Sequence, residues 1–122
     1  MAGERLVADT SALIHLLEGK ASAVALLQSA EVFVSFITEV ELLSSRKATK
    51  GQLDSTRALL HDCIILDTNA RIKELTIDLR KRHNLKIPDC FIAATAMHLD
   101  VPLITSDRGF DRLKDELMIY WL

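Results

Sequence analysis

The sequence has few cysteines and no long apolar run, and both features narrow the class of protein. Its two cysteines, Cys63 and Cys90, form neither a C-x-x-C pair nor a zinc-ligand spacing, so we interpret them as small buried residues in a reducing compartment. No stretch reaches the roughly 18 apolar residues that span a bilayer. Asp9 interrupts the only N-terminal apolar run too early for a secretory signal. We therefore expect a cytoplasmic protein with no membrane partner.

The sequence also lacks an excess of charge of one sign. It has 15 lysines and arginines against 17 aspartates and glutamates, which gives a net charge of −2. This balance neither favours nor excludes nucleic acid, because a local basic patch can bind phosphate on a nearly neutral protein. The 122 residues, 49% hydrophobic and 26% charged, suit one globular domain over residues 1–122.

Short β-rich runs alternate with amphipathic stretches along the whole chain. Strands are expected at residues 5–8, 31–35, 63–66, 102–105 and 117–122. Helices are expected at residues 11–18, 22–29, 36–46, 52–61, 69–83 and 88–99, with a short one at 108–113. This alternation predicts an α/β fold in which helices cover both faces of a parallel sheet, a three-layer α/β/α arrangement.

An acidic residue ends the first expected strand. The run Leu6-Val7-Ala8 leads to Asp9, and Thr10 or Ser11 is expected to begin the helix that follows. In α/β proteins, functional groups gather at the carboxyl ends of parallel strands. Three more acids hold similar places at element ends or on an adjoining helix: Glu41, Asp89 and Asp107. Each alone has a structural explanation as a turn, cap or helix-dipole residue, but the set of four favours a shared site.

Carboxylates that converge need a counter-ion or protons. Two of them at about 4 Å repel by roughly 4 kcal/mol at an effective dielectric near 20. An all-oxygen site of this kind suits Mg²⁺ or Mn²⁺ rather than zinc, and such ions support phosphodiester hydrolysis. The helical pattern does not choose between Glu39 and Glu41, which flank the apolar stripe of Phe36, Ile37, Val40 and Leu43 on opposite sides.

Four stretches resemble the motifs of the PIN-domain family and occur in the family's order. They are Val7-Ala8-Asp9-Thr10-Ser11, Ile37-Thr38-Glu39-Val40-Glu41-Leu42-Leu43, Pro88-Asp89-Cys90-Phe91-Ile92-Ala93-Ala94-Thr95-Ala96 and Leu103-Ile104-Thr105-Ser106-Asp107-Arg108-Gly109-Phe110. The compact form is similar to the toxin ribonucleases of VapBC-type toxin–antitoxin pairs. The resemblance implies a five-stranded parallel sheet in the order 3-2-1-4-5 and a metal-dependent endoribonuclease that uses Mg²⁺ or Mn²⁺. It also implies an RNA substrate, an antitoxin protein that blocks the acidic groove, and a homodimer.

The resemblance assigns roles to individual residues. It makes four acids catalytic and metal-binding and chooses Glu41 over Glu39; the set is Asp9, Glu41, Asp89 and Asp107. Three hydroxyl groups become supporting or substrate-facing groups: Thr10, Ser11 and Thr105. Arg108, next to Asp107, is a candidate contact to the scissile phosphate. The chain departs from the family pattern at Gly109, where many members carry a further acid, and Asp111 is expected on an exposed helix side.

Other interpretations stay open at this stage. The chain could be a non-catalytic PIN-like module that acts by protein contact. A phosphoacceptor receiver is disfavoured, because Asp9 is followed by Thr10 instead of a second acid and no lysine follows the last strand. Arg80, Lys81, Arg82, His83 and Lys86 form either a solvated helix end or a phosphate-binding edge. Tyr120 and Trp121 are interpreted as core or interface residues and not as base-stacking groups.

Overall fold

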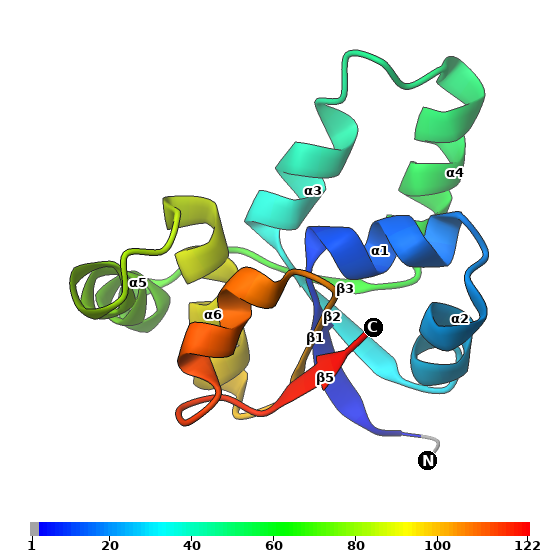
Figure 1. Cartoon of the computed structure of the whole chain (residues 1–122). Helices are drawn as coiled ribbons and strands as arrows, with labels where there is room; N and C mark the ends of the chain where they lie inside the picture. Colours follow the sequence, from blue (N-terminus) through cyan, green and yellow to red (C-terminus); the bar gives the residue numbers. More distant parts are fainter. Residues whose placement is uncertain (1–2) are drawn as a thin grey trace.

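Five parallel strands form one sheet in the computed structural model, which describes residues 3–122 (Figure 1). The sheet order is β3-β2-β1-β4-β5, and every neighbouring pair is parallel. The strands are β1 (Arg5–Ala8), β2 (Glu31–Ser35), β3 (Ile64–Leu66), β4 (Leu103–Thr105) and β5 (Ile119–Trp121). The predicted order and direction are therefore confirmed, and β1 lies at the centre.

Helices cover both faces of this sheet, which confirms the three-layer arrangement (Figure 1). One face packs against α1 (Thr10–Leu17), α2 (Ala21–Leu27), α3 (Phe36–Leu43) and α4 (Lys50–His61). The other packs against α5 (Ala70–Arg82), α6 (Ile87–Leu99) and the 3₁₀ helix η1 (Arg108–Leu113). Figure 1 shows α3 and α4 reaching beyond the edge of the sheet at which β1 ends.

The central strand supplies side chains to both cores. Leu6 and Ala8 pack on the α1 side, whereas Val7 packs on the α6 side, and all three are fully buried. A strand covered on both faces has no polar face, which explains why this run is continuously apolar in the sequence. Asp9 follows directly, so a carboxylate is fixed at the end of the most buried strand.

The start of α1 confirms one expectation, because the helix begins at Thr10. Neither Thr10 nor Ser11 caps the helix, because Asp9 itself is the N-cap: its backbone is extended and its Oδ1 accepts a hydrogen bond from Ala12 N at 2.8 Å. Gly19, at φ +72°, follows the end of α1 in the left-handed region that glycine tolerates. Asp9 thus has a structural role in addition to its place in the predicted site.

The apolar face of α3 also differs from the prediction. Val40 is 56% exposed, while Thr38 and Leu42 are the buried residues of this helix. The helix ends at Leu43, where Ser44 Oγ donates to Val40 O at 2.6 Å. The helix is therefore turned so that Thr38, and not Val40, faces the sheet.

The remaining sequence expectations concern the cysteines and the membrane. Cys90 is buried in α6 and Cys63 is half-buried, and both are free thiols. Among residues 3–122 no single helix is long and apolar enough to cross a membrane; only α1 and α2 taken together reach that length, and they are bent by 111°.

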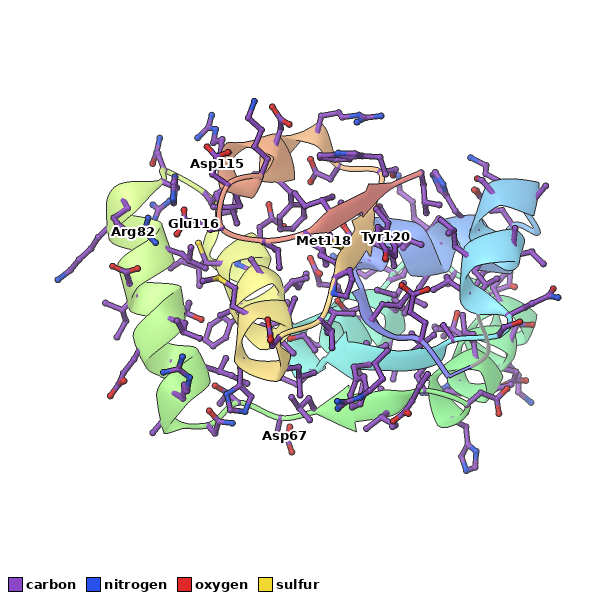
Figure 2. The ribbon with its side chains drawn as sticks, turned by 90° about the horizontal axis from the view of Figure 1, so that it is seen from below. Asp67, Arg82, Asp115, Glu116, Met118 and Tyr120 are labelled. Atoms are coloured by element: carbon purple, nitrogen blue, oxygen red, sulfur yellow. The ribbon has the colours of Figure 1, made fainter. Side chains whose placement is uncertain are left out.

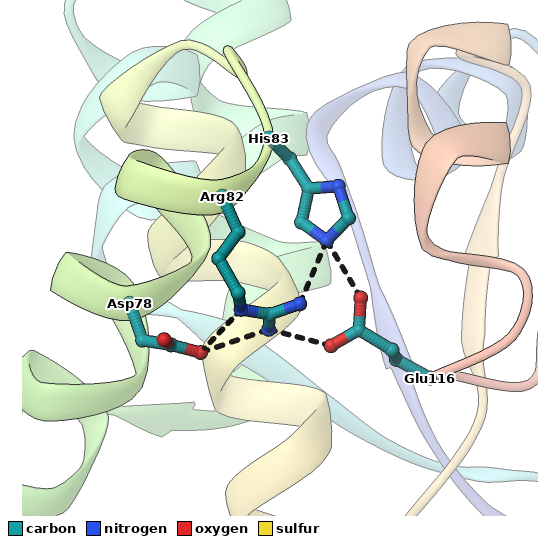
Figure 3. Close-up of polar contacts among 4 residues, drawn as sticks. All are labelled: Asp78, Arg82, His83 and Glu116. Carbon is teal, nitrogen blue, oxygen red and sulfur yellow. Dashed lines mark hydrogen bonds and ion pairs between the residues drawn. The ribbon is translucent and has the colours of Figure 1, made fainter.

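A polar cluster ties the end of α5 to the segment that precedes β5 (Figures 2 and 3). Arg82 Nη2 lies 2.6 Å from Glu116 Oε1, and His83 Nε2 lies 2.6 Å from Glu116 Oε2. Arg82 Nε also donates to Asp78 Oδ2 at 2.9 Å. Arg80 likewise donates to Leu85 O, so three members of the basic run make contacts that serve the fold.

Replacing Glu116 by glutamine is expected to lower the free energy of unfolding at pH 7 by about 1 kcal/mol, the upper end for partly exposed ion pairs. The hydrogen bond from Arg82 lowers the pKa of Glu116, so its contribution is present above the unfolded pKa near 4.5 and is lost as pH falls through the folded value. Urea unfolding at pH 7 and pH 3 measures this, with Asp115→Asn as the adjacent control. An equal loss at both pH values would assign the effect to packing.

Candidate active site

Asp9 is held by three hydrogen bonds at the end of β1. Asp9 is only 3% exposed to solvent. Oδ1 accepts from Ala12 N at 2.8 Å and from Ser11 Oγ at 2.7 Å, and Oδ2 accepts from Thr105 Oγ1 at 2.5 Å. A carboxylate offers about four acceptor positions. One position on Oδ2 therefore remains for a further ligand.

Hydroxyl groups connect Asp9 to the segment that follows β4. Thr105 is fully buried, and its Oγ1 accepts a hydrogen bond from Asp107 N at 2.9 Å while donating to Asp9. Ser11 Oγ accepts from Ser106 N at 3.0 Å. Because β1 and β4 are direct neighbours, these bonds fix the backbone of Asp107 relative to the carboxylate of Asp9.

The structure separates Glu41 from Glu39. Thr10 Oγ1, one residue after Asp9, donates to Glu41 Oε1 at 2.6 Å and lies 3.2 Å from Thr38 Oγ1. Glu39 lies on another side of α3, where it lines a separate cavity of about 420 Å³ with Arg57 and other residues. Glu41 is thus the glutamate of α3 that lies beside the Asp9 segment, and Thr10 is the residue that connects them.

Repulsion and burial raise the pKa of two of the four acids. The pKa of Asp89 is raised to about 6, first by burial and then by the charges of Asp107, Glu41 and Asp9; Lys86 opposes this. Burial also raises the pKa of Asp9, against hydrogen bonds that lower it, and Asp107 adds to the rise. Asp89 therefore lies within electrostatic reach of the other three acids, and Asp9 lies within reach of Asp107.

The donor set fits a hard divalent cation. Every candidate ligand is a carboxylate oxygen, the ligand type that Mg²⁺ and Mn²⁺ prefer. After burial, the charges of the other three acids raise the pKa of Asp89, and a cation between them would offset this repulsion. Within residues 3–122, however, no three His, Cys, Asp or Glu side chains stand close enough to form a ready-made metal cluster. Glu41 is bound to Thr10, and Asp107 Oδ1 accepts from Gly109 N at 2.9 Å. The four-acid metal site stays a prediction.

Gly109 shapes the position of Asp107. A Cβ at Gly109 would lie 3.1 Å from Asp107 Oδ1, so a side chain there would crowd the carboxylate that its own backbone N–H binds. This close approach gives a local reason for glycine where many members of the family carry a further acid. Asp111 is exposed on η1, as expected.

Two features of the site were missed in the sequence. Thr38 is buried in α3, and its hydroxyl forms a hydrogen bond with the hydroxyl of Thr10. Trp121 lies at the same edge of the sheet as Thr105, and the Arg108 guanidinium stacks on its ring at 4.2 Å from the centroid. Periodicity indicates only whether such residues are buried, so neither contact had a sequence signal.

A groove of about 930 Å³ opens beside the acids, between α1, α3 and α4. Thr10 and Glu41 lie at one end of it. Its lining combines apolar side chains with acidic and small polar ones, among them Ile14, Leu17, Glu18, Leu42 and Ser45. Thr10 and Glu41 line the groove and also belong to the candidate site. A molecule bound in the groove would therefore contact the candidate site.

The fold and these motifs define a known class of protein. The PIN domain family model matches residues 6–116, which is most of the chain. The chain belongs to the PIN-domain family. No curated protein sequence gives a significant match.

Solved structures show the same fold. A toxin–antitoxin complex from Klebsiella pneumoniae has a chain 28% identical to this one, with 96% of this chain and 99% of that chain covered and a TM-score of 0.79. VapBC-1 from nontypeable Haemophilus influenzae is 24% identical, with coverage of 96% and 97% and a TM-score of 0.79. VapBC2 from Rickettsia felis, bound to a DNA fragment from its promoter, is 17% identical, with coverage of 97% and 98% and a TM-score of 0.83.

Proposed function

We propose that this protein is a metal-dependent endoribonuclease of the cytoplasm and the toxin of a toxin–antitoxin pair. The observation that carries the proposal is a group of four acids from the end of β1, α3, α6 and the segment after β4, in which the charges of three act on Asp89. Membership of a family whose nucleases typically use a divalent metal supports it, and so does the likeness to a toxin–antitoxin complex.

Each acid has a distinct task in this proposal. Asp9, Glu41 and Asp89 hold Mg²⁺ or Mn²⁺, and Asp107 helps when RNA is bound. The bound ion supplies Lewis-acid polarisation of the phosphodiester and a more acidic water. Thr105 and Ser11 hold the Asp9 carboxylate so that Oδ2 keeps its free position, and Thr10 orients Glu41. Buried Asp9 stays in one geometry throughout, because all its hydrogen-bond partners are fixed by β1, α1 and β4.

The choice between Glu41 and Glu39 gives a matched test. We expect Glu41→Gln to reduce metal-dependent cleavage of labelled single-stranded RNA by about 100-fold, because the ligand charge is lost, and Glu39→Gln to stay within about twofold of the unmodified chain. Both substitutions remove one charge from the same helix. Cleavage is measured with Mg²⁺ or Mn²⁺, with EDTA, and with the metal restored.

The outcomes separate the proposal from its alternative. Cleavage that needs the metal and is lost only in Glu41→Gln supports the nuclease. Cleavage that survives EDTA, or that Glu41→Gln retains, contradicts it. If the folded protein cuts no RNA in a panel of varied sequence and fails to bind Mn²⁺ in a calorimetric titration, the non-catalytic PIN-like module is the better account.

The groove beside the acids suits an antitoxin segment. We propose that an amphipathic helix of the antitoxin packs on Ile14, Leu17 and Leu42 and places a basic side chain near Glu41. Apolar anchors in a groove and a charge pair at its end form a common mode of helix recognition. An apolar, arginine-containing helical peptide should inhibit cleavage, and failure of Leu17→Glu to weaken this inhibition would exclude the groove.

We also propose a homodimer. Val40, at 56% exposed, leaves apolar surface on α3 outside the lining of the groove. Sedimentation equilibrium of the purified chain checks this, and a monomer at micromolar concentration contradicts it.

A further inference from the structure

Arg108 and Trp121 form a stacked pair at the edge of the sheet where the acids lie. The guanidinium carbon of Arg108 lies 4.2 Å from the centroid of the Trp121 ring. Trp121 is half-buried and packs against one of the two apolar cores, whereas Arg108 is exposed. A buried ring of this kind is a fixed support, and the planar cation on its surface loses much of its freedom to move.

The pair is fixed to the acidic site by strand register. Trp121 is the direct partner of Thr105 in the β4–β5 pairing, and Leu122 N donates to Thr105 O at 2.9 Å. Thr105 in turn donates to Asp9. Neighbouring strands lie about 4.8 Å apart, so Trp121 on β5 is displaced by roughly 10 Å from Asp9 on β1. The stack holds the Arg108 guanidinium over Trp121 of β5, two strands from β1, at whose end Asp9 lies.

The Arg108 guanidinium has donors to spare. The ion pairs among residues 3–122 involve Lys20, Arg82 and His83 as the cations, and no described oxygen accepts a hydrogen bond from Arg108. Stacking leaves the N–H edge of a guanidinium free, and that edge matches two oxygens of a phosphate. The charge of exposed Arg108 therefore faces the Trp121 ring and is paired with no carboxylate among the described residues.

We propose that Arg108, positioned by Trp121, binds a backbone phosphate of single-stranded RNA a few nucleotides from the cleaved bond. The inference rests on the proposed nuclease function and changes the expectation that Arg108 contacts the scissile phosphate. A displacement of roughly 10 Å corresponds to a few steps of a stacked strand at about 3.4 Å each. Arg108 therefore acts on substrate affinity, and Trp121 is a positioning residue.

The test is steady-state cleavage of labelled single-stranded RNA by four variants. We expect Arg108→Gln to raise KM about tenfold while kcat changes less than about twofold, because a charge-assisted contact made equally before and during reaction is lost. Trp121→Leu is expected to raise KM about threefold, and Trp121→Phe to restore most of this. Arg112→Gln, which removes an exposed arginine from the same segment, is the control and should leave KM unchanged.

Coupling and salt dependence test the mechanism. A double variant that carries Arg108→Gln and Trp121→Leu should have a KM no higher than that of Arg108→Gln alone, because Trp121 acts only through Arg108. The slope of log KM against log salt should fall by about 0.7 in Arg108→Gln, the value for one phosphate contact on a single strand. The increase in KM should be the same for uridine-rich and adenosine-rich RNA, since a phosphate contact carries no base identity.

Trp121 also gives a readout that does not depend on cleavage. It is the only tryptophan of the chain, so its emission reports this position alone. Titration with RNA in EDTA should change that emission in the unmodified protein and in Arg112→Gln, and should require a higher RNA concentration in Arg108→Gln.

The failures are distinguishable. If the unmodified protein cleaves no RNA, the proposed function fails and this inference with it. If it cleaves RNA and Arg108→Gln has the same KM, only the inference fails. A raised KM in Arg108→Gln with no effect of either Trp121 variant overturns the positioning role. If KM rises in Arg108→Gln for only one of the two RNAs, uridine-rich or adenosine-rich, the phosphate contact is wrong and base stacking is favoured.

Discussion

Asp9→Asn is expected to reduce metal-dependent RNA cleavage by roughly 1,000-fold, about 4 kcal/mol of transition-state stabilisation, while the fold is retained. The amide has the shape of the carboxylate, and asparagine is as good an N-cap as aspartate. Its Oδ1 can keep the bonds from Ala12 N and Ser11 Oγ. Its NH₂ group replaces Oδ2, the one oxygen with a free acceptor position, so the metal loses its ligand.

Two measurements accompany the kinetic one. Circular dichroism and thermal unfolding should show a folded Asp9→Asn protein, because a residue that is 3% exposed and loses its charge no longer carries the burial penalty that raises its pKa. Asp111→Asn, at an exposed acid of η1, should cleave as fast as the unmodified protein. Equal rates for Asp9→Asn and Asp111→Asn would refute the assignment of Asp9.

Asp89→Asn should stabilise the metal-free protein near neutral pH. The folded pKa of Asp89 is about 6 against an ordinary value of 3.8, and burial is the first cause. An acid with a raised pKa contributes its stability below the unfolded pKa and loses it as pH rises through the folded value. Between pH 4 and pH 7.5 the unmodified protein should therefore lose up to about 3 kcal/mol at this position, and the variant should not.

Chemical unfolding in EDTA at the two pH values measures this difference. We expect Asp89→Asn to gain about 2 kcal/mol over the unmodified protein on going from pH 4 to pH 7.5, and Asp54→Asn, at an exposed position of α4, to gain nothing. With added Mn²⁺ the unmodified protein should become the more stable of the two. An ion that binds only the folded state stabilises it by mass action, and the variant lacks one of the ligands. A pH-independent difference between the proteins would contradict the raised pKa of Asp89.

Local signals in the sequence were sufficient for the framework of this fold. The all-apolar run of β1, the glycine after α1 and the proline at the start of α6 each have one dominant physical cause, and those elements lie within two residues of the expected places. The order of the strands came from the resemblance to the PIN-domain family and is confirmed. No local pattern specifies which strands of a parallel sheet are neighbours.

The parts that were missed depend on contacts between distant segments. The orientation of α3, with Val40 outside and Thr38 inside, is decided by how the helix sits on the sheet and not by its own apolar spacing. The same holds for Thr10 and Glu41, which are 31 residues apart, and for the stack of Arg108 on Trp121. The start of α1 shows the opposite case: a local signal predicted that Thr10 or Ser11 begins the helix, and the helix begins at Thr10 with Asp9 as its N-cap.

Because β1 is the central strand, its two neighbours are synthesised at very different times. Its neighbour β2 follows at once, but β4, with Thr105 and Asp107, comes about 100 residues later, which is roughly 5 to 20 seconds of translation. Every residue that lines the large groove lies between Thr10 and Thr56 and so leaves the ribosome first. The acidic edge is completed only when the last part of the chain is made, because the bond from Thr105 to Asp9 cannot form before β4 exists.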